Sequence, residues 1–102
     1  MRPNKQHFRI SAVRTEALFA SALQRFDEPT ATQIQEAVAA AIREFGRRGC
    51  AERVAQEFGD HPEIAITRMR WARGRVDDAF AGSRLAAAHA HLLGRRFIAR
   101  AA

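Results

Sequence analysis

The chain has 102 residues, 47% of them hydrophobic, and its formal net charge is +6. These values are typical of one globular domain with a modest core, and they exclude an intrinsically disordered chain. No apolar run is long enough to span a membrane, and the charged N-terminus lacks the apolar core of a signal peptide, so we expect a cytoplasmic protein.

Basic side chains exceed acidic ones mainly at the two ends of the chain, whereas the charges between residues 11 and 81 nearly cancel. Such an excess favours an acidic partner, with duplex DNA as the first candidate, although basic tails also serve solubility alone. We therefore expect a basic N-terminal arm at residues 1–10, a single helical domain at residues 11–93 and a basic C-terminal tail at residues 94–102.

No segment alternates between apolar and polar residues in the manner of a β-strand, and tyrosine is absent. The sequence therefore predicts an all-α fold, a compact bundle of four to five short helices. The first helix is predicted over about residues 11–27, with Ser11 as its N-cap and Pro29 beyond its end. Its inward side chains, taken from the helical spacing, are Phe8, Ala12, Thr15, Phe19, Ala22, Leu23 and Phe26.

A capping box opens the second predicted helix, either at Thr30 with Gln33 or at Thr32 with Gln35. The glycines on both sides of Arg47–Arg48 end this helix. Its inward side chains form the clearest helical stripe in the chain: Ile34, Ala37, Val38, Ala41, Ile42 and Phe45.

A short third helix is predicted from Cys50 to Phe58, with a left-handed Gly59 at its end. Cys50 is the only cysteine, so it cannot form an internal disulfide, and we expect a buried thiol. The inward side chains of this helix are Ala51, Val54, Ala55 and Phe58.

The fourth helix is predicted over residues 62–81, because Asp60 can cap it, Pro62 suits its first turn and Glu63 completes a capping box. Its core face consists of Ala65, Ile66, Met69, Ala72, Val76, Ala79 and Phe80. A fifth helix, capped by Ser83, has the inward side chains Leu85, Ala88 and Leu92.

A second stripe on the helix predicted over residues 62–81 lies away from its core face and consists of Ile64, Arg68, Trp71 and Arg75. Trp and Arg are enriched at interface hot spots, so this pattern indicates a binding surface. We expect an interface at Ile64, Trp71 and Arg75, either in a homodimer or with another partner. The alternative is that the first or fifth helix covers the stripe and Trp71 belongs to the core.

Residues 51–73 resemble a helix-turn-helix motif, in which a small residue stands about four positions before the glycine that starts the turn. Ala55 and Gly59 hold that relation, and Val54 and Phe58 match the inward apolar positions. The resemblance implies two helices joined at an angle, the second of which enters the major groove of DNA.

The motif normally has an apolar residue just after the turn, where this chain has Asp60. A turn one residue longer brings Ile66 and Met69 into the inward positions. The resemblance implies a dimeric DNA-binding transcriptional regulator with the helix at residues 62–81 as its recognition helix. It implies groove contacts from Thr67, Arg68 and Arg70, and phosphate contacts from Arg47, Arg48 and Arg53.

A looser resemblance covers about residues 8–80, from FRISAVRTEALFASALQRFDEP to MRWAR, and relates the chain to small, all-helical, uncharacterised proteins of actinobacteria. It agrees with the composition of the chain, in which alanine is frequent and arginine is used in place of lysine at every position except Lys5. This resemblance implies no activity.

The sequence shows no pattern of catalytic residues, so we expect no enzyme, no cofactor and no small-molecule substrate. The histidines are scattered, and His89 and His91 are two positions apart, which on a helix points them to different sides and prevents shared metal ligation. No glycine-rich phosphate loop or nucleophile elbow is present. Two hypotheses remain, a DNA-binding regulator and a homodimeric or partner-binding helical module.

Overall fold

The structure is a computed structural model that describes the backbone of residues 5–101 and the side chains of residues 9–81. Within this part the fold is all-helical and contains no strand, as predicted. Three long helices and one short 3-10 turn replace the four to five short helices expected. They are α1 (Lys5–Ala20), η1 (Arg25–Asp27), α2 (Ala31–Asp60) and α3 (Pro62–Ala101).

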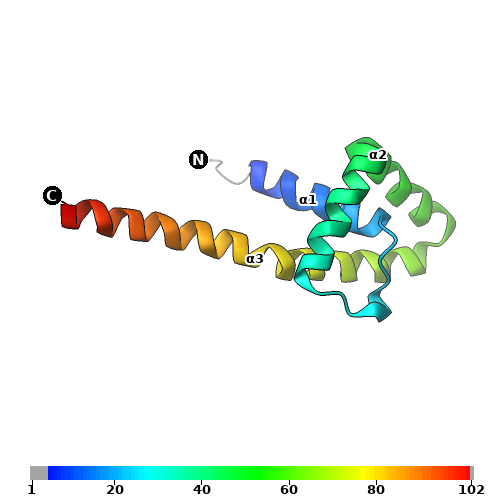
Figure 1. Ribbon diagram of the computed structural model, residues 1–102. Helices are drawn as coiled ribbons and strands as arrows, with labels where there is room; N and C mark the ends of the chain where they lie inside the picture. Colours follow the sequence, from blue (N-terminus) through cyan, green and yellow to red (C-terminus); the bar gives the residue numbers. More distant parts are fainter. Residues whose placement is uncertain (1–4, 102) are drawn as a thin grey trace.

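Each of the three long helices contacts the other two. Figure 1 shows α1 and α3 running roughly alongside each other, while α2 crosses them and turns back toward the beginning of α3. The last part of α3 continues beyond the body of the molecule. The whole molecule is therefore elongated, with extents of 61 × 33 × 24 Å.

The first helix begins and ends earlier than predicted. Ser11 lies inside α1 rather than at its N-cap, and its carbonyl accepts a hydrogen bond from the Thr15 hydroxyl (2.9 Å). At the other end, the hydroxyl of Ser21 donates to the carbonyl of Leu18 (2.6 Å), a local bond that competes with the helical one. The helix therefore ends at Ala20, and residues 5–10 of the expected arm form its first turns.

This early end changes which side chains of the first predicted helix face inward. Thr15 and Phe19 are buried as expected, but Ala12 and Ala22 are exposed. Phe26 lies on η1 instead of α1 and is 80% exposed, so its predicted inward position is wrong. Phe8 lies outside the described side chains.

Thr30 is the N-cap of α2, which confirms the first of the two predicted capping boxes, Thr30 with Gln33. The main-chain N–H of Gln33 donates to the Thr30 hydroxyl (3.2 Å), and the main-chain N–H of Thr30 donates to the Gln33 side chain (2.8 Å). The predicted stripe of this helix is confirmed, because all its members are buried or partly buried in the core: Ile34, Ala37, Val38, Ala41, Ile42 and Phe45.

Gly46 breaks α2 with φ 71° and ψ 170°, a conformation in which glycine is strongly preferred. The helix resumes at once, so Gly49 lies within it and the two predicted helices form a single kinked one. The thiol of Cys50 is buried and donates to the carbonyl of Ala41 across the kink (3.6 Å). The predicted buried thiol is therefore confirmed, and it connects the two halves of α2.

The turn between α2 and α3 is a single residue, His61. Its N–H donates to the carbonyl of Glu57 (2.7 Å), and its carbonyl accepts from the N–H of Ala65 (2.9 Å), so it closes one helix and opens the next. The capping role predicted for Asp60 and the left-handed Gly59 are both wrong, because α2 continues through these residues. The break falls immediately before Pro62, where the proline ring disfavours helical geometry.

Helix α3 runs without interruption through Ser83 and Gly94, so the predicted start of a fifth helix is wrong. Glycine is tolerated inside a helix, and no proline follows Pro62 to end it. The inward side chains expected in that fifth helix, Leu85, Ala88 and Leu92, lie outside the described side chains.

The core lies where α1 packs against both other helices, and it contains many alanines, which allow close approach. The ring of Phe19 stacks on that of Phe58, with centroids 6.1 Å apart. Two further predicted core positions are wrong: Ala55 on α2 is exposed and Ile66 on α3 is 44% exposed. The buried residues include Ala17, Leu18, Ile34, Val38, Ala41, Ala65, Ala72, Val76 and Ala79.

Candidate functional site

The side chain of Arg68 is bonded to the C-terminal end of α1 and the residues that follow it. Its Nε donates to the carbonyl of Phe19 (2.8 Å), and its Nη2 donates to the carbonyls of Ser21 (3.0 Å) and Leu23 (2.9 Å). The last carbonyls of a helix have no intrahelical donors and carry partial negative charge, so a guanidinium is well suited to satisfy them. Arg68 therefore serves as a cap for α1 from a distant helix.

Aromatic rings surround the same guanidinium. Its central carbon lies 5.0 Å from the ring centre of Trp71 and 5.7 Å from that of Phe19, within cation–π range. Burial lowers the pKa of Arg68, while the nearby Glu57 carboxylate opposes this shift. The group stays charged in neutral solution because an arginine pKa starts far above 7.

Arg75 acts on the same connecting segment, residues 21–30. Its Nη2 donates to the carbonyl of the buried Pro29. Arg68 and Arg75 thus hold both ends of the segment against α3. The sequence placed both arginines on one helical stripe with Trp71. In the structure both guanidinium groups are bonded to main-chain carbonyls, so neither is a free surface charge beside Trp71.

Between the connecting segment and the first turns of α3 lies an open hollow of about 390 Å³. Phe26 at its rim is 80% exposed and Ile64 is 64% exposed, while Trp71 is half-buried. Trp71 packs on the core with part of its surface and lines the hollow with the rest, so it is neither fully core nor fully exposed. The hollow is lined by Gln24, Arg25, Phe26, Glu63, Ile64, Thr67, Arg68 and Trp71.

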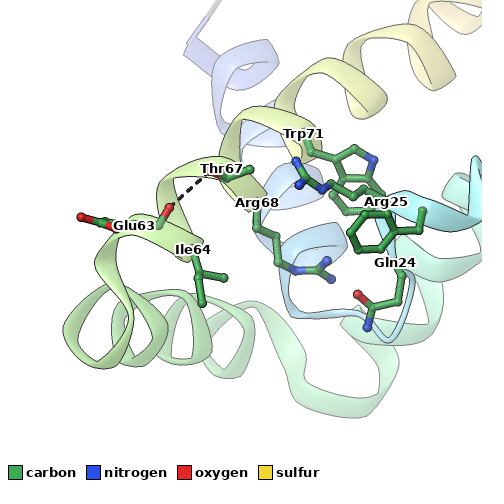
Figure 2. Close-up of a pocket in the computed structure, with 8 residues that line it drawn as sticks. Gln24, Arg25, Glu63, Ile64, Thr67, Arg68 and Trp71 are labelled. Carbon is green, nitrogen blue, oxygen red and sulfur yellow. Dashed lines mark hydrogen bonds between the residues drawn. The ribbon is translucent and has the colours of Figure 1, made fainter.

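Charged residues of opposite sign reach the hollow from opposite sides. Figure 2 shows Glu63 at one end, on the first turn of α3, with its carboxylate turned outward, and Arg25 coming from the connecting segment on the other side, with its guanidinium beside Trp71. Thr67 lies between them, and its hydroxyl donates to the main-chain carbonyl of Glu63 (3.3 Å). The surface is therefore an apolar patch with the acidic Glu63 at one end and two arginines, Arg25 and Arg68, in the rest of its lining.

Of the predicted interface residues, Ile64 and Trp71 are brought together in the hollow, whereas Arg75 is turned to Pro29. Phe26, Arg25 and Glu63 were not predicted as members of this site, and Phe26 was predicted to face inward. The usable signal was Ser21 ahead of Pro29, because the Ser21 hydroxyl bonds to the carbonyl of Leu18 at the point where α1 ends, and Phe26 then lies outside the helix.

The predicted DNA contacts are spread over two helices. Arg47, Arg48 and Arg70 are exposed, as is Thr67. The guanidinium of Arg53 lies over the ring of Phe45, 3.8 Å from its centre. A groove contact by Arg68 would require its bonds to the end of α1 to break.

The helix-turn-helix resemblance corresponds to the second half of α2 and the beginning of α3. These helices are joined by His61 alone, and the longer turn that the motif match required does not form. Met69 packs on the core, but Ile66 does not.

Other chemistry in the described part of the chain is sparse. Within it, no three His, Cys, Asp or Glu side chains are grouped to hold a metal ion. Burial and the nearby Glu16 raise the pKa of the Cys50 thiol, while Arg53 opposes them. Among the described residues, no helix is long and apolar enough to cross a membrane.

Comparison with protein-family models, with curated proteins and with solved structures finds no match to this chain.

Proposed function

We propose that this protein is a non-enzymatic helical interaction module that binds a protein partner through the hollow between the connecting segment and α3. The observation that carries this proposal is the joint exposure of Phe26 and Ile64 beside Trp71. Single exposed apolar residues are common, but adjacent large ones around a tryptophan are typical of protein interfaces.

The anchoring of the hollow supports the proposal. Its two walls are joined by the hydrogen bonds from Arg68 to the end of α1 and by the bond from Arg75 to Pro29. A surface that is already ordered loses less conformational entropy when it binds. A partner would therefore meet a shape that needs little rearrangement.

The test is a photo-crosslinking amino acid placed at Ile64 in the full chain, expressed in the cells that make it. We expect irradiation to join the chain to a protein, and we expect Phe26→Ser to suppress that product. The matched control carries the same crosslinker at Gln56, which is exposed on α2 and lies outside the hollow. Equal products from both positions, or no protein product at position 64, would contradict the proposal.

Duplex DNA is the second candidate partner, because of the charge distribution along α3. No acidic residue follows Asp78, whereas Arg84, Arg95, Arg96 and Arg100 do. A stretch of helix that carries basic residues and no acidic ones attracts a polyanion. In this proposal the helix-turn-helix-like pair of helices positions the basic part of a cytoplasmic regulator on DNA.

Duplex affinity measured against salt concentration tests this second candidate. A DNA-binding protein loses affinity steeply as salt rises, and Arg95→Ala with Arg96→Ala should reduce that slope by about 2. Arg70→Ala tests a groove contact from an exposed position without disturbing the cap of α1. An absence of duplex binding at low salt contradicts the DNA proposal.

A further inference from the structure

We infer that the hollow binds a second copy of this chain, in a twofold dimer where each Arg25 pairs with Glu63 of the other copy. This inference rests on the proposed function, because it names the partner of the same surface. In a twofold interface the same patch faces itself, so it must be complementary to its own rotated copy.

The shape of the surface meets this requirement. Phe26 lines the hollow together with Ile64 and Trp71, and 80% of its surface is exposed. A twofold rotation brings the Phe26 ring of one copy over the hollow of the other, and the reverse contact follows by symmetry. Both rings are thereby removed from water against apolar neighbours.

The charges meet the same requirement. Glu63 and Arg25 stand on opposite sides of the hollow, as Figure 2 shows. Rotation about an axis through the hollow exchanges these sides, so each Arg25 faces a Glu63 of the other copy. The guanidinium of Arg68, which also lines the hollow, is already bonded to the carbonyls at the end of α1. Two equivalent ion pairs then frame the apolar contact and set its orientation.

The net charge of +6 does not oppose this pairing at the hollow. Residues 9–81 contain eleven basic and eleven acidic side chains, so the excess comes from the two ends of the chain. At the hollow itself Arg25 and Arg68 are balanced by Glu63 and the neighbouring Asp27. The apolar patch therefore lies on a nearly neutral surface, where a second copy is not repelled.

Charge reversal tests the pairing in the full-length purified chain. We expect sedimentation velocity to show the mass of the parent chain rising toward that of a dimer between micromolar and millimolar protein. Arg25→Glu alone and Glu63→Arg alone each place like charges opposite each other twice, so each should weaken the dimer at least about tenfold. Both side chains are exposed, and thermal unfolding monitors whether each variant remains folded.

Mixing the two single variants is the decisive measurement. In a mixed dimer both charge pairs are again of opposite sign, so Arg25→Glu and Glu63→Arg chains should associate with each other better than either does alone. Trp71, the only tryptophan, lines the hollow and should shift its emission to the blue on association. Phe26→Ser should abolish both the association and the shift.

A parent chain that stays monomeric at millimolar concentration overturns the inference, and so do single variants that dimerise like the parent. If crosslinking from position 64 then captures a different protein, the proposed interaction module stands and only the second copy is excluded. If crosslinking captures no protein, the interaction module itself fails.

Discussion

The Nε of Arg68 on α3 donates to the main-chain carbonyl of Phe19 on α1 at 2.8 Å, across 49 residues of sequence. This bond belongs to a set that satisfies the carbonyls left free where α1 ends. Because the same arginine lies beside Trp71, it connects the stability of the fold with the shape of the hollow.

Replacing Arg68 should destabilise the protein. Arg68→Ala leaves several half-buried carbonyls without a donor, and we expect a loss of about 2–3 kcal/mol in the free energy of unfolding. Arg68→Lys should recover only part of this, since one ammonium group cannot span the carbonyls that the planar guanidinium reaches. Denaturant unfolding measures both, with Arg70→Ala as the matched control on the same helix. Equal effects of Arg68→Ala and Arg70→Ala would contradict the structural role.

The kink in α2 should make Gly46 sensitive to substitution. Gly46→Ala places a side chain at φ 71°, and we expect a cost of about 1–3 kcal/mol in the free energy of unfolding. Backbone strain alone accounts for this cost, since no neighbouring atom lies close to the added carbon. Gly74 also has open space around it but lies within α3. Gly74→Ala should therefore stabilise the protein by about 0.4–1 kcal/mol. Thermal unfolding of the two variants should shift in opposite directions.

The capping box at the beginning of α2 distinguishes two nearby threonines. Thr30→Ala removes the side-chain acceptor for the N–H of Gln33 and should cost about 1 kcal/mol. Thr32→Ala changes an exposed position inside the helix, where alanine is the better helix former, so it should be neutral or slightly stabilising. Comparable losses from both variants in urea unfolding would exclude Thr30 as the cap.

The buried thiol of Cys50 should respond to pH in a defined direction. Its pKa is raised in the folded state, mainly by burial, so the folded protein holds this proton more tightly than the unfolded chain does. Stability should therefore be unaffected by this group below the pKa of the unfolded thiol, about 8.5, and should fall as pH rises above that value.

Two measurements check this prediction for Cys50. Iodoacetamide should modify the thiol slowly in the folded protein and rapidly in denaturant, because the thiolate is the reactive form and the folded thiol is buried. Cys50→Ala should lose the part of the pH dependence that begins near the pKa of the unfolded thiol, about 8.5. Fast alkylation of the native protein would show that the site is open.

Local patterns predicted much of the fold, and the reason is visible at particular residues. Thr30 with Gln33, the apolar stripe from Ile34 to Phe45 and the break at Gly46 depend on residues a few positions apart. Their hydrogen bonds and backbone preferences are complete within one helix, so sequence spacing was sufficient to place them.

Helix ends were harder to predict where two local signals competed. Asp60 and Glu63 form a plausible capping box, but the restriction imposed by Pro62 on His61 placed the break one residue later. Similarly, Ser83 has the composition of a cap, yet nothing forces α3 to end before it.

By itself, the sequence determined that the chain is helical, that Cys50 is buried and that Ile64 and Trp71 share one stripe of their helix. Only the tertiary structure decided what that stripe does. A helical spacing shows which side chains point the same way, but it cannot show which unpaired carbonyls lie opposite them. Arg68 and Arg75 bond to such carbonyls and are structural, whereas Ile64 and Trp71 line the hollow with Phe26.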